Sequence, residues 1–477
     1  MNFTSLEYLI FLAIAFLIYF LLGQKARIYW LLGCSYYFYG CWNPKYALLM
    51  LFSTLITYLS GLFIGKSKTE RQKKIYVFLS FFVNLAILFV FKYYSFSVGA
   101  LNRLFALKIP ETLNLLLPVG ISFYTFQALS YTLDVYRKDV EVERNFFRYA
   151  LFVSFFPQLV AGPIEKSKDL LKQFYVKHPF SWERFHQGVL WIAIGFFYKL
   201  VIADRAAMVV NQVYNHLDSY QDGGGLYLIA ATVLFAIQIY FDFHAYSTIA
   251  KGSALMMGYH LSQNFKKPYF AVSIKDFWRR WHVSLSSWFK EYLYFPLGGS
   301  RKGFWRTQIN LMIVFMVSGL WHGAAWTFVV WGALHGAYQV IENLVQRDSN
   351  SKNNTSLLKK VFKIIFTFCL VDFAWIFFRA NSMGDAFKVI GNLFDFGKPI
   401  GADLLGCSGV EMVILLVACA AVFGLELISE KVDLLKFLYN RNIVVRYTFY
   451  YILIFAVIIF GIYGPGFDAQ EFIYFQF

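Results

Sequence analysis

Histidine side chains within apolar sequence are the residues of this chain whose types could do chemistry. The segment from Trp278 to His335 carries His282 and His322 among tryptophans and arginines. His322 is flanked by Leu-Trp on one side and Gly-Ala-Ala-Trp on the other. Burying an imidazole in such surroundings costs free energy, so a histidine found there is a candidate functional residue. Because a neutral imidazole can accept a proton from a hydroxyl group, this pattern is typical of general acid–base catalysis.

The segment Lys275–Tyr292 predicts an amphipathic helix around the first of these histidines. At roughly 100° per residue, aromatic and charged side chains fall on opposite faces. On the polar face His282 lies between Arg279 and Lys290, whose positive charges favour the neutral imidazole. The indoles of the other face, Trp281 among them, have the alternative interpretation of an aromatic belt at headgroup depth. Such a helix lies at the membrane interface or lines a water-filled entrance.

Motifs for metal and nucleotide binding are missing from the sequence. It has no HExxH, HxxxH or Cys/His ligand spacing. On a continuous helix His322 and His335 would lie roughly on opposite faces and about 20 Å apart. We therefore expect no metal site. The GxxxxGK[ST], GxGxxG, GxSxG and HxxxxD motifs are also missing, which leaves the chemistry to isolated histidines and hydroxyl groups.

The elements that position these residues are membrane helices. The 477 residues are 58% hydrophobic and 15% charged, and the mean hydropathy is +0.52. The core of a soluble protein could not bury this much apolar surface. Several apolar runs are shorter than the about 20 residues of a simple span, so we expect about eleven to thirteen transmembrane or re-entrant helices. No composition shift marks a soluble domain, which predicts one membrane-embedded domain over residues 1–477.

The positive charge of the chain is concentrated in short connections. Lys and Arg number 44 against 28 Asp and Glu, a net charge of +16. Short basic stretches such as Lys66–Lys74 predict cytoplasmic loops, and counting three spans back from there puts the N-terminus outside. This surplus needs no nucleic acid. A cytoplasmic rim facing lipid accounts for it, and some of these cations could attract an anionic cytosolic cofactor.

The sequence of the histidine region resembles a known family. WRRWHVSLSSWFKEYLYFPLGGSR and SGLWHGAAWTFVVWGALHG are similar to the signature region of the membrane-bound O-acyltransferase family, here residues 275–336. The resemblance is specifically to the bacterial branch that is typified by alginate and peptidoglycan O-acetylation proteins. SYYFYGCWNPKY, LPVGISFYTFQALSYTLDVYR and FFPQLVAGPIEK extend the resemblance over most of the chain, in order. It implies an all-α polytopic protein of the bacterial cytoplasmic membrane, with helices around a central tunnel.

The resemblance also implies roles for individual residues. His322 corresponds to the histidine that the family ties to catalysis, and His282 to the other signature position. The implied acyl donor is cytosolic acyl-CoA, most simply acetyl-CoA, for which Arg279, Lys290 and Trp281 are the candidate binding residues. The implied partner is an extracytoplasmic transferase of the serine-hydrolase type, which loads the acyl group onto a polysaccharide.

The last six residues, FIYFQF (472–477), resemble an aromatic hexapeptide of this branch, in which the tyrosine is an acyl carrier. Here that tyrosine is Tyr474. A phenol has a pKa of about 10, so at neutral pH it needs an adjacent base to attack a thioester, and a neutral histidine is the natural candidate. The alternative is that Tyr474 only anchors the chain at the membrane interface.

The sequence departs from the family pattern in one stretch, IYFDFHAYSTIAKG. His244 and Thr248 stand there where relatives more often have a small residue and an aspartate. This departure argues against a role for an acidic residue at position 248, and we assign no catalytic role to His244.

Two alternative functions remain open from the sequence. The first is D-alanyl transfer to teichoic acid, in which the donor is a carrier-protein thioester. The second is a non-catalytic transporter or flippase, which would also account for buried polar residues and basic loops. The sequence does not identify the acceptor glycan.

Overall fold

Every element of secondary structure named below, all of it in the described part of the chain, is a helix, so the all-α prediction is confirmed. The structure is a computed structural model that describes residues 1–113, 115–160, 162–347, 356–397, 405–428, 441–463 and 472–475. Within these ranges six helices are long and apolar enough to cross a membrane, so the protein is a multi-pass membrane protein. They are Pro44–Lys66, Glu70–Phe105, Gly225–Met256, Leu357–Arg379, Gly409–Ile428 and Ile443–Phe460.

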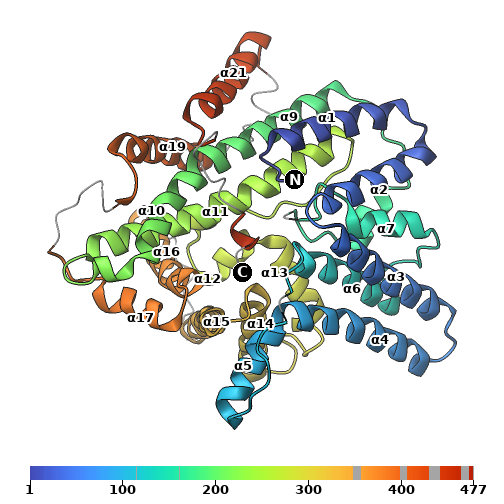
Figure 1. Ribbon diagram of the computed structural model, residues 1–477, viewed down its shortest axis with the longest axis horizontal. Coiled ribbons are helices and arrows are strands. Elements are labelled where there is room, and N and C mark those ends of the chain that lie inside the picture. The colour runs from blue at the N-terminus through green and yellow to red at the C-terminus, as the bar shows by residue number, and fades with distance from the viewer. Residues whose placement is uncertain are drawn as a thin grey trace. The chain divides into compact units, whose positions relative to one another are not determined.

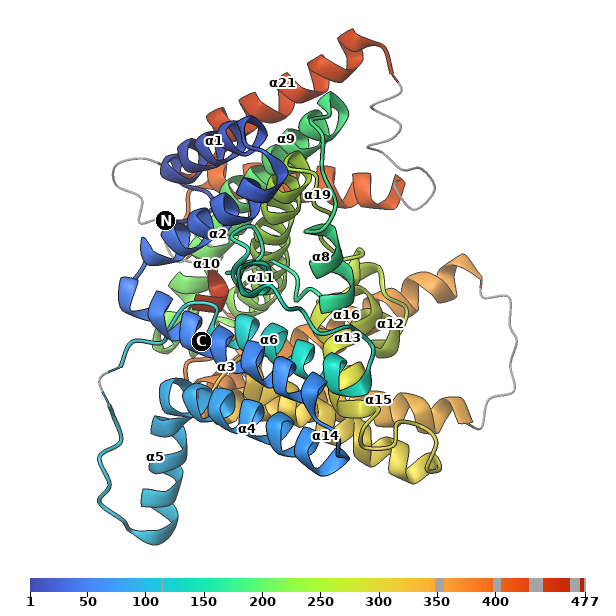
Figure 2. The ribbon, with the colours of Figure 1, turned by 90° about the vertical axis from the view of Figure 1, so that its right-hand side faces the viewer.

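The first of two compact units comprises Met1–Ile192 and Tyr246–Gln263. Within it α3, α4 and α6 lie side by side (Figures 1 and 2). Hydrogen bonds between small polar side chains join these helices, because lipid offers no partner for such groups. The helices are α1 (Leu6–Leu21), α2 (Gln24–Gly40), α3 (Pro44–Lys66), α4 (Glu70–Leu88), α5 (Tyr94–Phe105), α6 (Ile121–Arg137), α7 (Phe146–Ser154) and α8 (Ser167–Gln173); α9 (Trp182–Phe196) begins here.

The second unit comprises Ala193–Ala245 and Asn264–Phe477. It contains all three residues predicted to be catalytic. Two of its segments, η2 (Phe197–Ala203) and η5 (Lys290–Tyr294), are π-helical, a local form that is frequent at functional sites. Its helices are α10 (Asp204–Asn215), most of α11 (Gly225–Met256), α12 (Ile274–Arg280), α13 (Val283–Phe289), α14 (Phe304–His322), α15 (Trp326–Arg347), α16 (Leu357–Arg379), α17 (Met383–Asn392), α19 (Gly409–Ile428) and α21 (Ile443–Phe460), and η6 (Ile473–Phe475) is a short 3-10 turn.

Glycines bring α14 and α15 into close contact, side by side in both views (Figures 1 and 2). A Cβ atom on Gly319 would lie 2.3 Å from the carbonyl oxygen of Phe328, and one on Gly332 would lie 2.4 Å from that of Phe315. Only glycine permits this approach of the two backbones, as in other membrane helix pairs. The glycines of SGLWHG and WGALHG therefore fix the end of α14, where His322 lies.

A buried carboxyl group makes the stability of the first unit depend on pH. Glu165 is 4% exposed and accepts hydrogen bonds from the Ser262 backbone N–H at 2.6 Å and hydroxyl at 2.8 Å. Burial is the dominant effect and raises the pKa of Glu165 from 4.5 to about 7. Between these two pH values the folded chain holds a proton that the unfolded chain has released. The stability that Glu165 contributes is therefore fully present below pH 4.5 and is lost as the pH rises through about 7.

We expect Glu165→Gln to remove this pH dependence. An uncharged amide at position 165 has no ionised form to bury, so the variant should melt at a higher temperature than the wild type at pH 8 and at a similar temperature at pH 5. Thermal unfolding in detergent at both pH values measures the effect. Glu141→Gln, at an exposed carboxylate, is the control. An unchanged pH dependence in Glu165→Gln would show that other groups cause it.

Candidate active site

The predicted helix over Lys275–Tyr292 is broken in the structure, so that prediction was wrong. Helix α12 ends at Arg280, α13 begins at Val283, and His282 between them has a φ of 42°. The segment around Asn264 pairs with the backbone freed at the break: the Val283 N–H donates to the Asn264 carbonyl at 2.9 Å. The Ser284 hydroxyl donates to the Asn264 side chain at 2.6 Å. Strained backbone of this kind concentrates at functional sites.

The break turns His282 into the protein interior. The side chain is fully buried, with its ring 4.7 Å from that of Phe243, whereas Arg279 and Lys290 are exposed. The placement of His282 on a shared polar face with these two cations was therefore wrong. His282 lies outside the six candidate spans, and burial lowers the pKa of its imidazole to about 3. The imidazole is neutral because it is desolvated.

His322 is the last residue of α14 and is 4% exposed. Its ring centroid lies 5.0 Å from that of Trp331, which is also 4.9 Å from the ring of His335. The expected separation of about 20 Å between the two histidines was wrong, because the helix stops at His322 and resumes at Trp326. The Nδ1 atom of His335 accepts a hydrogen bond from the indole of Trp278 at 3.2 Å.

Tyr474 lies in the C-terminal turn η6, close to both His282 and His322. Its ring centroid is 5.7 Å from that of His322, 6.5 Å from that of His282 and 4.7 Å from that of Phe243. Its hydroxyl oxygen is buried. The structure thus brings together three residues that are up to 192 positions apart in the sequence (282 to 474), although their catalytic roles stay predictions.

The second unit also contains a cavity of about 780 Å³. Arg279 and Lys290, whose role in donor binding stays a prediction, line it together with two cations that the sequence analysis did not select, Lys275 and Arg347. Ser318 lies on its wall, one helical turn before His322. Side-chain amides contribute further polar groups to its lining. They belong to Gln308, Gln339, Asn343 and Gln346.

Trp281, the third residue predicted for donor binding, is not among the residues that line this cavity. It is 1% exposed, and its ring stacks on Phe277 at 5.5 Å and contacts Trp375 at 5.2 Å. His244 likewise packs among aromatic rings, with Tyr198 at 5.0 Å. Within the described residues no group of three or more His, Cys, Asp and Glu side chains could hold a metal ion.

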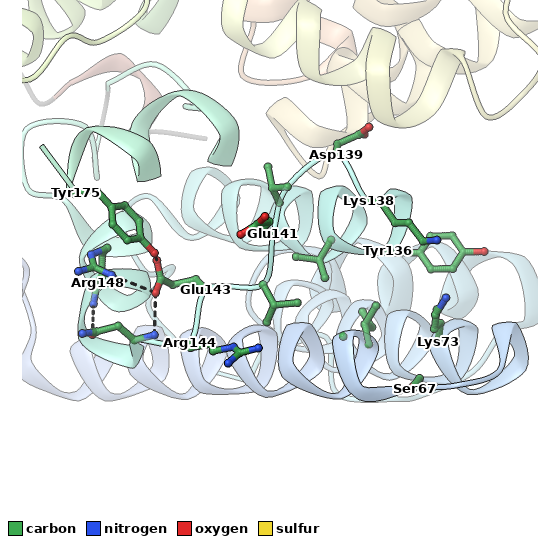
Figure 3. Close-up of a pocket in the computed structure, with 16 residues that line it drawn as sticks. Ser67, Lys73, Tyr136, Lys138, Asp139, Glu141, Glu143, Arg144, Arg148 and Tyr175 are labelled. Atoms are coloured by element: carbon green, nitrogen blue, oxygen red, sulfur yellow. Dashed lines mark hydrogen bonds and ion pairs between the residues drawn. The ribbon is translucent and has the colours of Figure 1, made fainter.

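The first unit has a separate cavity of about 930 Å³ beneath the loop at residues 138–145 (Figure 3). Its buried carboxylate, Glu143, accepts hydrogen bonds from the Tyr175 hydroxyl at 2.5 Å and the Asn145 N–H at 2.8 Å. Arg148 lies 3.4 Å from the same carboxylate. None of the predicted site residues lines this cavity, so we assign it no chemistry.

Comparison with known proteins supports the resemblance. The model of the membrane-bound O-acyltransferase (MBOAT) family matches residues 31–379. The probable alginate O-acetylase AlgI of Pseudomonas putida is 38% identical over 436 residues, which cover 89% of this chain and 88% of the relative. The peptidoglycan O-acetyltransferase of Helicobacter pylori is 34% identical over 81% of this chain and 78% of its own length. A teichoic acid D-alanyltransferase of Bacillus subtilis is 28% identical over 56% of this chain and 70% of its own length.

Proposed function

Because this chain belongs to the membrane-bound O-acyltransferase family, we propose that it transfers an acetyl group from cytosolic acetyl-CoA for the O-acetylation of an extracytoplasmic polysaccharide such as alginate or peptidoglycan. The chain is an O-acyltransferase, related to polysaccharide O-acetylases. The transporter interpretation of the sequence is therefore wrong. The observation that carries the proposal is the proximity of His322, His282 and Tyr474.

The first chemical step takes place on the Tyr474 hydroxyl. The imidazole of His322 accepts the phenol proton, and the phenol oxygen attacks the thioester carbonyl carbon. The C–O bond forms as the C–S bond breaks, and the departing thiolate takes the proton back from the imidazolium. His282, uncharged through burial, polarises the carbonyl or orients the phenol. The products are acetyl-Tyr474 and free CoA thiol.

The second step moves the acetyl group to the outer side. A hydroxyl group of an extracytoplasmic serine-hydrolase-type partner attacks the aryl ester of Tyr474, which restores the phenol. The partner then acetylates the glycan. We propose that the chain lies in the bacterial cytoplasmic membrane, with the N-terminus outside and the basic loops inside. We further propose that residues 1–477 act as one acyltransferase domain, since the family match crosses both compact units.

Four cations support acetyl-CoA as the donor. Lys275, Arg279, Lys290 and Arg347 line the cavity whose wall includes Ser318, one helical turn before His322. The phosphate groups of CoA carry several negative charges, whereas the phosphopantetheine arm of a carrier protein carries one. A cavity with four cations therefore favours the CoA thioester over the carrier-protein donor of the D-alanyl alternative.

The experiment that tests the function uses the purified protein in nanodiscs with radiolabelled acetyl-CoA. We expect release of CoA thiol and a covalent label on the protein. In parallel, a D-alanyl carrier-protein thioester should release no carrier-protein thiol and should leave no label on the protein. If the carrier protein reacts and acetyl-CoA does not, the donor assignment is wrong.

We expect the double substitution Arg279→Gln and Lys290→Gln to raise the KM for acetyl-CoA by about three- to tenfold with little change in kcat, because exposed charges each contribute modestly to binding. The effect should shrink as the salt concentration rises. The matched control is Lys138→Gln with Arg144→Gln, which removes two cations from the other cavity (Figure 3). An equal change in KM in the control would indicate a general effect of surface charge.

A further inference from the structure

A buried ion cluster lies in the second unit, apart from the residues assigned to the reaction. The Lys199 ammonium lies 2.9 Å from Asp204 and 2.8 Å from Asp242, and the exposed fraction of each of the three residues is at most 5%. The sequence analysis did not select any of them. The signal that could have led to the cluster is Lys199, an ionisable residue within a predicted apolar span, which marks a candidate functional site.

The cluster is bonded directly to the C-terminal turn. The second carboxylate oxygen of Asp242 accepts a hydrogen bond from the backbone N–H of Ile473 at 2.8 Å. Ile473 and Phe472 are 1% and 0% exposed, and Tyr474 is the next residue along the chain. Asp242 on α11 therefore holds the backbone immediately before the tyrosine.

The segment that carries Lys199 also holds the chain upstream of this turn. In η2 the Leu200 carbonyl accepts a hydrogen bond from the Ile462 N–H at 3.0 Å. Just beyond η2, Arg205 donates to the Phe460 carbonyl at 2.6 Å. The same short stretch of chain thus fixes the C-terminal region both at the end of α21 and, through Lys199 and Asp242, at η6.

We propose that Asp242, held by Lys199, is a positioning residue that docks the C-terminal turn and fixes the Tyr474 hydroxyl beside His322. The inference rests on the proposed role of Tyr474 as acyl carrier. Its physical basis is geometry: the Ile473 N–H donates, at 2.8 Å in a buried site, to the Asp242 oxygen that does not face Lys199. An N–H that donates to a charged acceptor there forms a stronger bond than one that donates to a neutral group.

The cluster also explains why the turn has one defined position. A buried carboxylate without partners is unfavourable, because the protein then replaces none of the hydration that the group has lost. Lys199 forms an ion pair with one oxygen of Asp242, and the Ile473 N–H donates a hydrogen bond to the other. If the turn left its site, that oxygen would lose its partner, so the carboxylate favours the docked state.

The test measures docking of the turn in the full-length protein in nanodiscs. Carboxypeptidase A, which releases aromatic and aliphatic C-terminal residues, should reach Tyr474 and Ile473 at least about tenfold faster in Asp242→Ala than in the wild type, the factor expected for one lost hydrogen bond to a charged acceptor. Mass spectrometry follows the release. The rate of Tyr474 labelling should fall by a similar factor, with the KM for acetyl-CoA unchanged.

Asp204→Asn is the matched control, since it removes a carboxylate that faces the same lysine without touching Ile473. It should leave the turn protected. Equal digestion of Asp242→Ala and the wild type would overturn the proposal. Equal exposure of the turn in Asp204→Asn would also overturn it, because the integrity of the whole cluster would then be the cause.

A second pair of variants tests the same hydrogen bond if Asp242→Ala does not fold. Ile473→Pro removes the N–H donor and leaves all three charged side chains in place, whereas Ile473→Ala shortens the side chain but keeps the donor. Only the proline variant should expose the turn. The digestion assay does not require acyl transfer, so a failed carrier role for Tyr474 and a failed docking role for Asp242 are distinguishable.

Discussion

Replacement of His322 by alanine is expected to lower acetyl transfer from acetyl-CoA by about 10²- to 10⁴-fold, the range that a general base contributes. The phenol of Tyr474 needs a base at neutral pH, and the His322 ring is the nearer of the two catalytic candidates, at 5.7 Å against 6.5 Å for His282. Both the release of CoA thiol and the covalent label should be lost. The binding of acetyl-CoA should persist, because no cation of the cavity is altered.

The control for this result is another buried histidine. His335→Gln keeps an acceptor for the Trp278 indole N–H and removes an imidazole that also contacts Trp331. We expect it to retain activity. The comparison separates loss of the base from disturbance of packing around Trp331. Near-normal turnover in His322→Ala would mean that His282 or another group is the base.

The class of the fold could be predicted, and the candidate site could be proposed, because both depend on patterns in the local sequence. Apolar runs predict membrane helices because backbone groups without hydrogen-bond partners are costly in lipid. His322 can be recognised as a polar residue within such a run. The glycines of the same signature prove to be the contact points of α14 and α15. These features depend on residues that are near one another in the chain.

The break at His282 could not be predicted from the same pattern. The alternation of aromatic and charged residues runs through the break without interruption, so helical periodicity extends across it. What ends the helix is tertiary: Asn264 and Lys266 bond to the backbone on each side of His282. The periodicity of residues 275–292 does not indicate these hydrogen bonds, because their partners lie outside that segment.

The docking of the C-terminal turn is likewise a long-range contact. Asp242 and Ile473 are 231 residues apart, and the sequence analysis found Tyr474 through its hexapeptide without indicating what holds it. The ion cluster could have been recognised from Lys199 and Asp242 as charges within apolar runs. Their mutual pairing, and the spare oxygen left for Ile473, required the structure.

Replacement of Tyr474 by phenylalanine is expected to abolish the covalent acetyl label while CoA thiol continues to be released. The substitution removes only the hydroxyl oxygen, so the ring can still pack on Phe243 and Phe472 and the turn can remain docked. With the phenol gone, His322 can activate a water molecule at the same thioester, and acetyl-CoA is hydrolysed. Label on protein and release of thiol, followed together over time, measure this uncoupling.

Tyr447→Phe, on α21, is the matched control and should keep both products. If Tyr474→Phe retained the label, the phenol would not be the carrier, and Tyr474 would be an interface anchor. Loss of both products would instead mean that the hydroxyl is needed to place the thioester. Only the loss of the label with continued release of thiol shows that the base and the carrier are separate groups. The rings of His322 and Tyr474, 5.7 Å apart, are the two groups to which we assign these roles.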